Sequence, residues 1–214
     1  STLSNMATIA NFGMWTNFAL INNNGNFVNL GTGNLLINPG SEFRNNSFFL
    51  SGASSTMNLN GIFNNFNQLT MQANGSITVG PTGFLNNSVN ILISDNAQIT
   101  NNGTINNFQC AYIFNVATIT NFSTINNQGF IHLFPPGIIS PNQPNNIGNG
   151  ITFNQVNPTG LCVNVSRALD GVGTPIVVNV NDLVNPLVGL CPSFSATING
   201  ANSVVFDCSN CGVN

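Results

Sequence analysis

Apolar and polar residues alternate along most of the first 134 positions, in short runs such as Ile-Thr-Asn and Thr-Ile-Asn. A period of two is typical of β-strands, whereas a helix repeats its apolar residues every three or four positions. The runs are rich in Ile, Val, Thr and Phe, and Asn-Gly, Asn-Asn and Pro-Gly pairs stand between them. Because such pairs favour turns, the pattern predicts many short strands joined by tight turns.

The predicted strands belong to a longer repeat of about 20 residues. Residues 97–114 align with residues 117–134 at an offset of 20, and residues 7–21 align with residues 117–131. Apolar residues recur at three positions of the repeat. The first position is held by Ile37, Met57, Val79, Ile99 and Ile119, the second by Phe43, Phe63, Leu85, Ile105 and Ile125, and the third by Phe49, Leu69, Ile91, Ala111 and Ile131. Before residue 37 the register is ambiguous, although Ile21 and Phe27 fit a shorter turn and Ile9 and Trp15 begin the series.

A constant offset of one coil predicts an all-β fold, a parallel β-solenoid (β-helix) over residues 1–134 with roughly six or seven coils. A hairpin-based barrel or sandwich would not keep matching residues at this offset. Residues 135–150 are rich in Pro and Gly and are expected to form a connector. Residues 151–214 contain short alternating runs between turn residues and are expected to form a small antiparallel β module.

Four of the five cysteines fall in this C-terminal module: Cys162, Cys191, Cys208 and Cys211. Their even number predicts two disulfides in an oxidising compartment, with the pairing left open. The Cys208-Ser-Asn-Cys211 spacing also occurs in redox and zinc sites. Here the βα context of a redox motif and a second Cys-x-x-Cys pair are both missing. Cys110 aligns with Phe130 and is interpreted as a buried, inert thiol, with an intersubunit bridge as the alternative.

The chain has 44 Asn and only seven charged residues, with no Lys. Two Arg cannot form the basic face that nucleic acids or anionic membranes require, and no apolar stretch is long enough for a transmembrane helix. In a solenoid, equivalent residues stack about 4.8 Å apart, so that columns of like charge would repel. Asn can instead form carboxamide ladders and can adopt the left-handed conformation of corners. The low charge is therefore expected of a solenoid, because equivalent outward side chains of successive coils lie next to one another.

Six Asn-x-Ser/Thr sequons are candidate N-glycosylation sites if the source glycosylates secreted proteins. They stand at Asn45, Asn74, Asn86, Asn102, Asn121 and Asn164. A start at Ser1 without a signal peptide is expected of a mature, secreted chain.

Candidates for chemistry are few. Glu42 and Asp95 occupy different places in the repeat, more than two coils apart, and so do not form the carboxylate pair of a glycosidase. Asp170 and Asp182 lie outside any calcium-binding loop pattern. His132, the only histidine, is expected to face outward from a strand. We therefore expect no catalytic residues, no cofactor and no metal; an enzyme using Asp95 or Glu42 is the third-ranked alternative.

The Ile-Thr-Asn-x-Gly-Thr-Ile-Asn-Asn pattern resembles the Asn/Gly/Thr-rich parallel β-solenoids of secreted surface proteins, including fibre-forming and adhesin-type proteins, over roughly residues 7–134. The resemblance implies an extracellular location, or one at the surface of a cell or virion. It transfers no catalytic or binding residues.

The leading hypothesis is a non-enzymatic structural subunit of an extracellular filament or surface fibre. Residues 1–8 contain nothing that resembles a cap. An open N-terminal coil would therefore meet the C-terminal module of the next subunit, or donate a strand to it, and form a head-to-tail homopolymer. The alternative is an adhesin or receptor-binding fibre protein, viral or cellular, that recognises glycans or a surface partner. The aromatic residues Trp15, Phe18 and Phe66 would then stack on sugars, whereas in the first hypothesis they fill the core.

Overall fold

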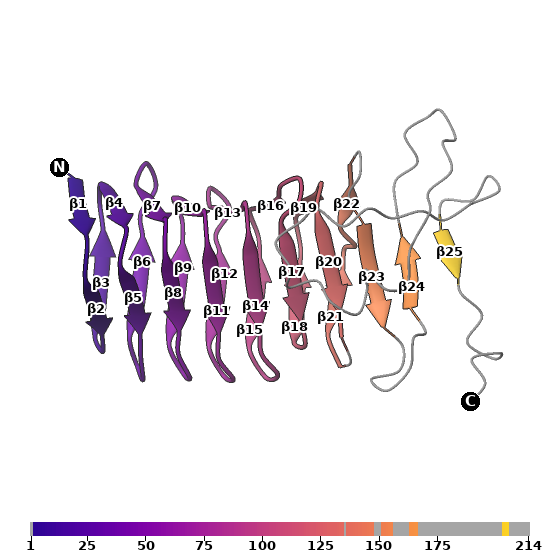
Figure 1. Ribbon diagram of the computed structural model, residues 1–214, viewed down its shortest axis with the longest axis horizontal. Coiled ribbons are helices and arrows are strands. Elements are labelled where there is room, and N and C mark those ends of the chain that lie inside the picture. The colour runs from indigo at the N-terminus through magenta and orange to yellow at the C-terminus, as the bar shows by residue number, and fades with distance from the viewer. Residues whose placement is uncertain (1, 135, 148–150, 156–162, 167–202, 206–214) are drawn as a thin grey trace.

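The predicted parallel β-solenoid is confirmed, with about seven turns and coils of about 20 residues. The structure is a computed structural model, and it describes residues 2–134, 136–147, 151–155, 163–166 and 203–205. The coils stack into a straight rod, and the N-terminus lies at one end of it (Figure 1). Each coil contributes one strand to each of three sheets, so the rod has three faces and three corners.

We name the three sheets A, B and C. Sheet A contains β1 (Thr2–Asn5), β4 (Leu20–Asn23), β7 (Glu42–Asn45), β10 (Ile62–Asn65), β13 (Phe84–Asn87), β16 (Thr104–Asn107), β19 (Thr124–Asn127) and β22 (Asn145–Asn146). Sheet B contains β2 (Thr8–Asn11), β5 (Asn26–Asn29), β8 (Phe48–Ser51), β11 (Gln68–Met71), β14 (Asn90–Ile93), β17 (Tyr112–Asn115), β20 (Phe130–Leu133), β23 (Ile151–Gln155), β24 (Val163–Ser166) and β25 (Ser203–Val205). Sheet C contains β3 (Met14–Asn17), β6 (Asn34–Ile37), β9 (Thr56–Leu59), β12 (Ser76–Val79), β15 (Gln98–Asn101), β18 (Thr118–Asn121) and β21 (Ile138–Pro141).

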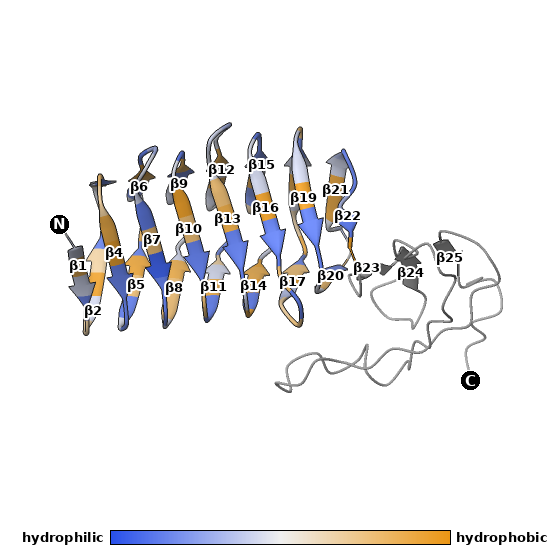
Figure 2. Cartoon of the chain, turned by 90° about the horizontal axis from the view of Figure 1, so that it is seen from above, coloured by the Kyte–Doolittle hydropathy of each residue, from blue (hydrophilic) through white to orange (hydrophobic). Residues whose placement is uncertain are grey.

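Coils are numbered by their strands, so that β1–β3 form the first coil and β19–β21 the seventh. Most strands have four residues and alternate between inward and outward positions, which Figure 2 shows as changes of hydropathy within single strands. Leu20 pairs with Thr2 and with Glu42, which sets offsets of 18 residues for the first coil and 22 for the second. The first coil is therefore short, as the positions of Ile21 and Phe27 suggest.

The ten residues of the first two predicted columns are all buried: Ile37, Met57, Val79, Ile99, Ile119, Phe43, Phe63, Leu85, Ile105 and Ile125. The second column is one stack, because Phe43, Phe63, Leu85, Ile105 and Ile125 pair in sequence.

The first predicted column combines two neighbouring stacks and is wrong in its register. Met57 pairs with Leu35 and Ile77, whereas Ile37 and Val79 both pair with Leu59. Residues two apart on a strand face the same side, so a shift of two leaves the hydrophobic pattern unchanged. The third predicted column contains the same error at Ala111, because Ile91 pairs with Ile113.

An unbroken ladder of asparagines runs along one interior corner. The last residue of every sheet A strand belongs to it: Asn5, Asn23, Asn45, Asn65, Asn87, Asn107, Asn127 and Asn146. Each Nδ2 donates to the Oδ1 of the next member at 2.7–2.9 Å. The expected carboxamide ladder is confirmed, but this one is buried rather than exposed. Burial is tolerated because both ends of each carboxamide find partners.

The sheets continue beyond residue 134, the predicted end of the solenoid. β21 and β22 extend sheets C and A, and β23 pairs in parallel with β20. β24 and β25 then pair antiparallel to their neighbours in sheet B. At the corners, Asn74 and Asn96 have φ values of 62° and 59°, which agrees with the expected left-handed role of Asn.

Candidate functional site

The first coil forms an open end of the solenoid. β1, β2 and β3 are the terminal strands of sheets A, B and C, and each pairs on one side only. Their outer backbone N–H and C=O groups have no strand partner among the described residues. Three such edges lie together at the N-terminal end (Figure 1). An open edge of this kind is a template for pairing with another chain.

Large apolar side chains project from all three corners of this coil. Met6, Phe12 and Phe18 follow its three corner asparagines and are 78%, 64% and 78% exposed. Asn24 and Asn38 stand in the places of Met6 and Phe18 one coil later. At the remaining corner Leu30 takes the place of Phe12, and exposed phenylalanines recur at single corners further along the rod, such as Phe122. Among the described coils, the first is the one in which all three corners carry an exposed large apolar side chain, and clustered exposed apolar side chains mark interaction sites.

Leu3 and Met14, 42% and 71% exposed, add further apolar surface to the first coil. Ile9 and Trp15 face inward and pack, partly buried, against the core. The Trp15 ring meets Phe27 of the second coil edge-on at a centroid distance of 5.5 Å. The end of the rod therefore has an apolar interior as well as apolar corners.

The corner asparagines show how one coil recognises the next. Asn5 donates from Nδ2 to Asn23 Oδ1 at 2.7 Å, and Asn11 donates to Asn29 Oδ1 at 2.8 Å. The Oδ1 atom of Asn5 accepts the N–H of Ala7, at 3.0 Å. A carboxamide oxygen can accept two hydrogen bonds. At the later ladder positions, this oxygen accepts a hydrogen bond from the Nδ2 atom of the preceding coil. Asn5 has no preceding coil among the described residues, so its Oδ1 atom keeps this second acceptor position for another chain.

The first two coils carry no charged side chain. The nearest charges, Glu42 and Arg44 in β7, are 2.6 Å apart and pair with each other. Hydrogen bonds from Arg44 hold the pKa of the Glu42 carboxyl below its usual value, and Asn64 contributes a further hydrogen bond at 2.6 Å. Association at this end would therefore rest on apolar and hydrogen-bonding contacts, and its strength would change little with salt concentration.

The sequon asparagines lie in different environments. Asn45 and Asn121 are fully buried and hydrogen-bonded, which leaves no space for a glycan on the folded chain. Asn74 and Asn102 are exposed, and Asn86 is half-buried. Among these five sequons, glycosylation of the folded chain is therefore sterically open at the exposed positions.

Several predicted sites lie outside the residues whose side chains the structure describes. They are Asn164, the disulfide candidates Cys162, Cys191, Cys208 and Cys211, and the carboxylates Asp170 and Asp182. Cys110 lies in the described part of the chain, in the corner before β17. Its interpretation as a buried thiol is wrong, because Cys110 is exposed in a corner with φ of 66°. A left-handed corner turns the side chain away from the core, which an alignment to Phe130 does not show.

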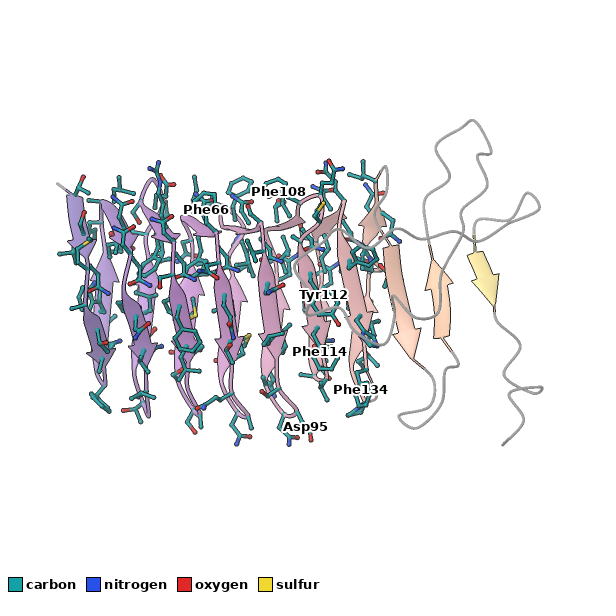
Figure 3. The ribbon with its side chains drawn as sticks, viewed as in Figure 1. Phe66, Asp95, Phe108, Tyr112, Phe114 and Phe134 are labelled. Atoms are coloured by element: carbon teal, nitrogen blue, oxygen red, sulfur yellow. The ribbon has the colours of Figure 1, made fainter. Side chains whose placement is uncertain are left out.

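The candidate chemical groups do not converge. Asp95 lies in the corner after β14, at the edge of the rod opposite Phe66 and Phe108 (Figure 3), whereas Glu42 is on the face of sheet A. His132 accepts or donates a hydrogen bond at 3.0 Å to the Tyr112 hydroxyl, whose pKa is raised by burial. No group of three metal-binding side chains occurs in the described part of the chain.

Comparisons with protein-family models, curated proteins and solved structures gave no match. Within the described residues, no helix has the length and apolar character needed to cross a membrane.

Sequence reasoning identified an open N-terminal coil but missed the residues that distinguish it. Met6 and Phe12 were not singled out, and Phe18 was expected to fill the core or to stack on sugars. A usable signal exists, because Asn5, Asn11 and Asn17 recur every six residues and each is followed by a large apolar residue.

Proposed function

We propose that the protein is a non-enzymatic structural subunit of an extracellular filament or surface fibre, in which copies join head to tail through the first coil. The observation that carries this proposal is the N-terminal end, where three unpaired strand edges coincide with three exposed apolar corners. A heterologous contact of this kind, repeated without closure, gives a filament.

The coil architecture suits a mechanical role. Every coil is tied to the next by parallel strand pairing in three sheets and by the buried asparagine ladder. A void inside the fifth to seventh coils is lined by leucine and isoleucine, such as Leu85, Ile105 and Ile125. This apolar lining favours packing between coils.

The C-terminal module is proposed to supply the other half of the contact. Antiparallel strands β24 and β25 extend sheet B at that end, and disulfides among the C-terminal cysteines would stabilise so small a module. The incoming first coil would then lie against this module or add a strand to it.

Phe18→Glu is expected to abolish filaments under conditions in which the unmodified chain assembles. The substitution places a charge in an apolar contact that excludes water. Phe18 is exposed, so the folded monomer should tolerate the change. Negative-stain electron microscopy and light scattering measure the assembly, and circular dichroism checks the fold. Deleting residues 1–10 should have the same effect.

Phe122→Glu is the matched control. Phe122 follows Asn121 at the same corner as Phe18 and is 59% exposed, but it lies in the sixth coil, far from the first. Filaments from the Phe122 variant and none from the Phe18 variant place the contact at the end. Filaments of normal length from both variants, or from the deletion, would exclude the proposed interface.

A further inference from the structure

A second apolar surface lies on the middle of the rod, away from the first coil. Phe66, Phe84 and Phe108 come from three successive coils and are 46%, 40% and 40% exposed. Phe66 and Phe108 lie along the same edge of the rod (Figure 3), after the ends of β10 and β16. Two strand spacings separate their coils, which is about 10 Å. Phe84 begins β13 in the coil between them.

A row of carboxamides runs beside these rings on the outer face of sheet A. Asn64, Asn86 and Asn106 pair in register on β10, β13 and β16. Asn106 donates from Nδ2 to Asn86 Oδ1 at 2.8 Å, and Asn86 donates to Asn64 Oδ1 at 2.8 Å. These bonds fix the orientation of the row. The three asparagines and the three phenylalanines form what we call the amide–aromatic strip.

The row retains hydrogen-bonding capacity. A carboxamide offers two N–H donors and two acceptor positions, and Asn86 uses one of each within the row. Asn86 is also half-buried rather than buried, so its remaining groups can reach solvent. On β10 and β16, each asparagine stands two residues before an exposed phenylalanine. The strip therefore presents oriented polar groups and aromatic rings side by side along the rod.

We propose that the amide–aromatic strip binds an extended, neutral polysaccharide laid along the solenoid axis. Sugar rings combine apolar C–H faces, which pack on aromatic rings, with hydroxyl groups, which hydrogen-bond to carboxamides. The spacing of Phe66 and Phe108 is close to the length of two sugar rings in an extended chain. The ligand is neutral because Arg44, the one arginine among the described residues, pairs with Glu42.

The test is native affinity electrophoresis of the full chain in gels that contain hydroxyethyl cellulose or galactomannan, two neutral polymers with extended backbones. At least one of them should retard the protein. The affinity of the double variant Phe66→Ala/Phe108→Ala for the polymer should be lower by at least about tenfold, because the variant loses two aromatic contacts. Phe122→Ala, which removes an exposed ring elsewhere, should bind as the unmodified chain does.

Absence of retardation by both polymers would overturn the proposal, as would equal retardation of the double variant. Stronger binding to heparin than to either neutral polymer would show that the strip does not select neutral sugars. The outcome is independent of filament assembly, because the strip and the first coil share no residue.

Discussion

Truncation of Phe63 to alanine is expected to lower the free energy of unfolding by about 3–5 kcal/mol. The Phe63 ring is fully buried, stacks on Phe43 at 5.1 Å and meets Phe49 edge-on at 5.3 Å. Strand β10 pairs with β7 and β13 on its two sides, so the backbone cannot move in to fill the cavity. Urea unfolding followed by circular dichroism measures the change.

Phe66→Ala is the control for this experiment, three residues further along the same chain. The Phe66 side chain is exposed, so its loss should change the free energy of unfolding by no more than about 0.5 kcal/mol. If the two variants are equally stable, the aromatic stack is not part of the core.

Asn65→Ala is expected to destabilise the protein by about 2–4 kcal/mol, although it replaces a polar residue by an apolar one at a buried position. Asn65 Nδ2 donates to Asn87 Oδ1 at 2.9 Å and to the Asn90 carbonyl at 2.8 Å. Its Oδ1 accepts from Asn45 at 2.8 Å. Removal of this side chain leaves buried donors and acceptors without partners. The measurement is again urea unfolding at neutral pH.

The neighbouring variants test whether the ladder is directional. Asn64→Ala, on the outer face of the same strand, should cost less than about 1 kcal/mol because water replaces the lost contacts. Asn65→Asp keeps the size but directs a carboxylate at the oxygen atoms of Asn87 and Asn90. These acceptors and the burial raise the pKa of the introduced carboxyl. The stability of this variant should therefore increase as the pH falls from 7 to 4. A pH-independent Asn65→Asp variant would contradict the donor direction of the ladder.

The sequence predicts the coil because its signal is periodic and local. Ile105 and Ile125 lie one coil apart and also match at that offset in the sequence. The sequence does not distinguish Leu35 from Ile37 as the partner of Met57, because residues two apart share a face and both are apolar. Only the pairing of whole strands selects the register.

The interior position of the asparagine ladder could not be predicted from hydropathy. A buried asparagine and an outward one have the same hydropathy and cannot be told apart in the sequence, as Asn64 and Asn65 show. The difference arises from strand pairing, which brings each buried carboxamide within hydrogen-bonding distance of its equivalents. Similarly, Phe18 and Phe122 have the same local pattern. Their different roles follow from the position of the first coil at the end of the rod.

The most direct test of head-to-tail assembly is photo-cross-linking from that end. A photoreactive phenylalanine analogue is placed at Phe18 or, as the control, at Phe122, and assembled protein is irradiated and analysed by denaturing electrophoresis and mass spectrometry. Head-to-tail assembly predicts cross-linked dimers and higher oligomers from Phe18, joined to residues 151–214 of the neighbouring copy, and none from Phe122. Monomers alone from Phe18, or equal yields from both positions, would contradict it.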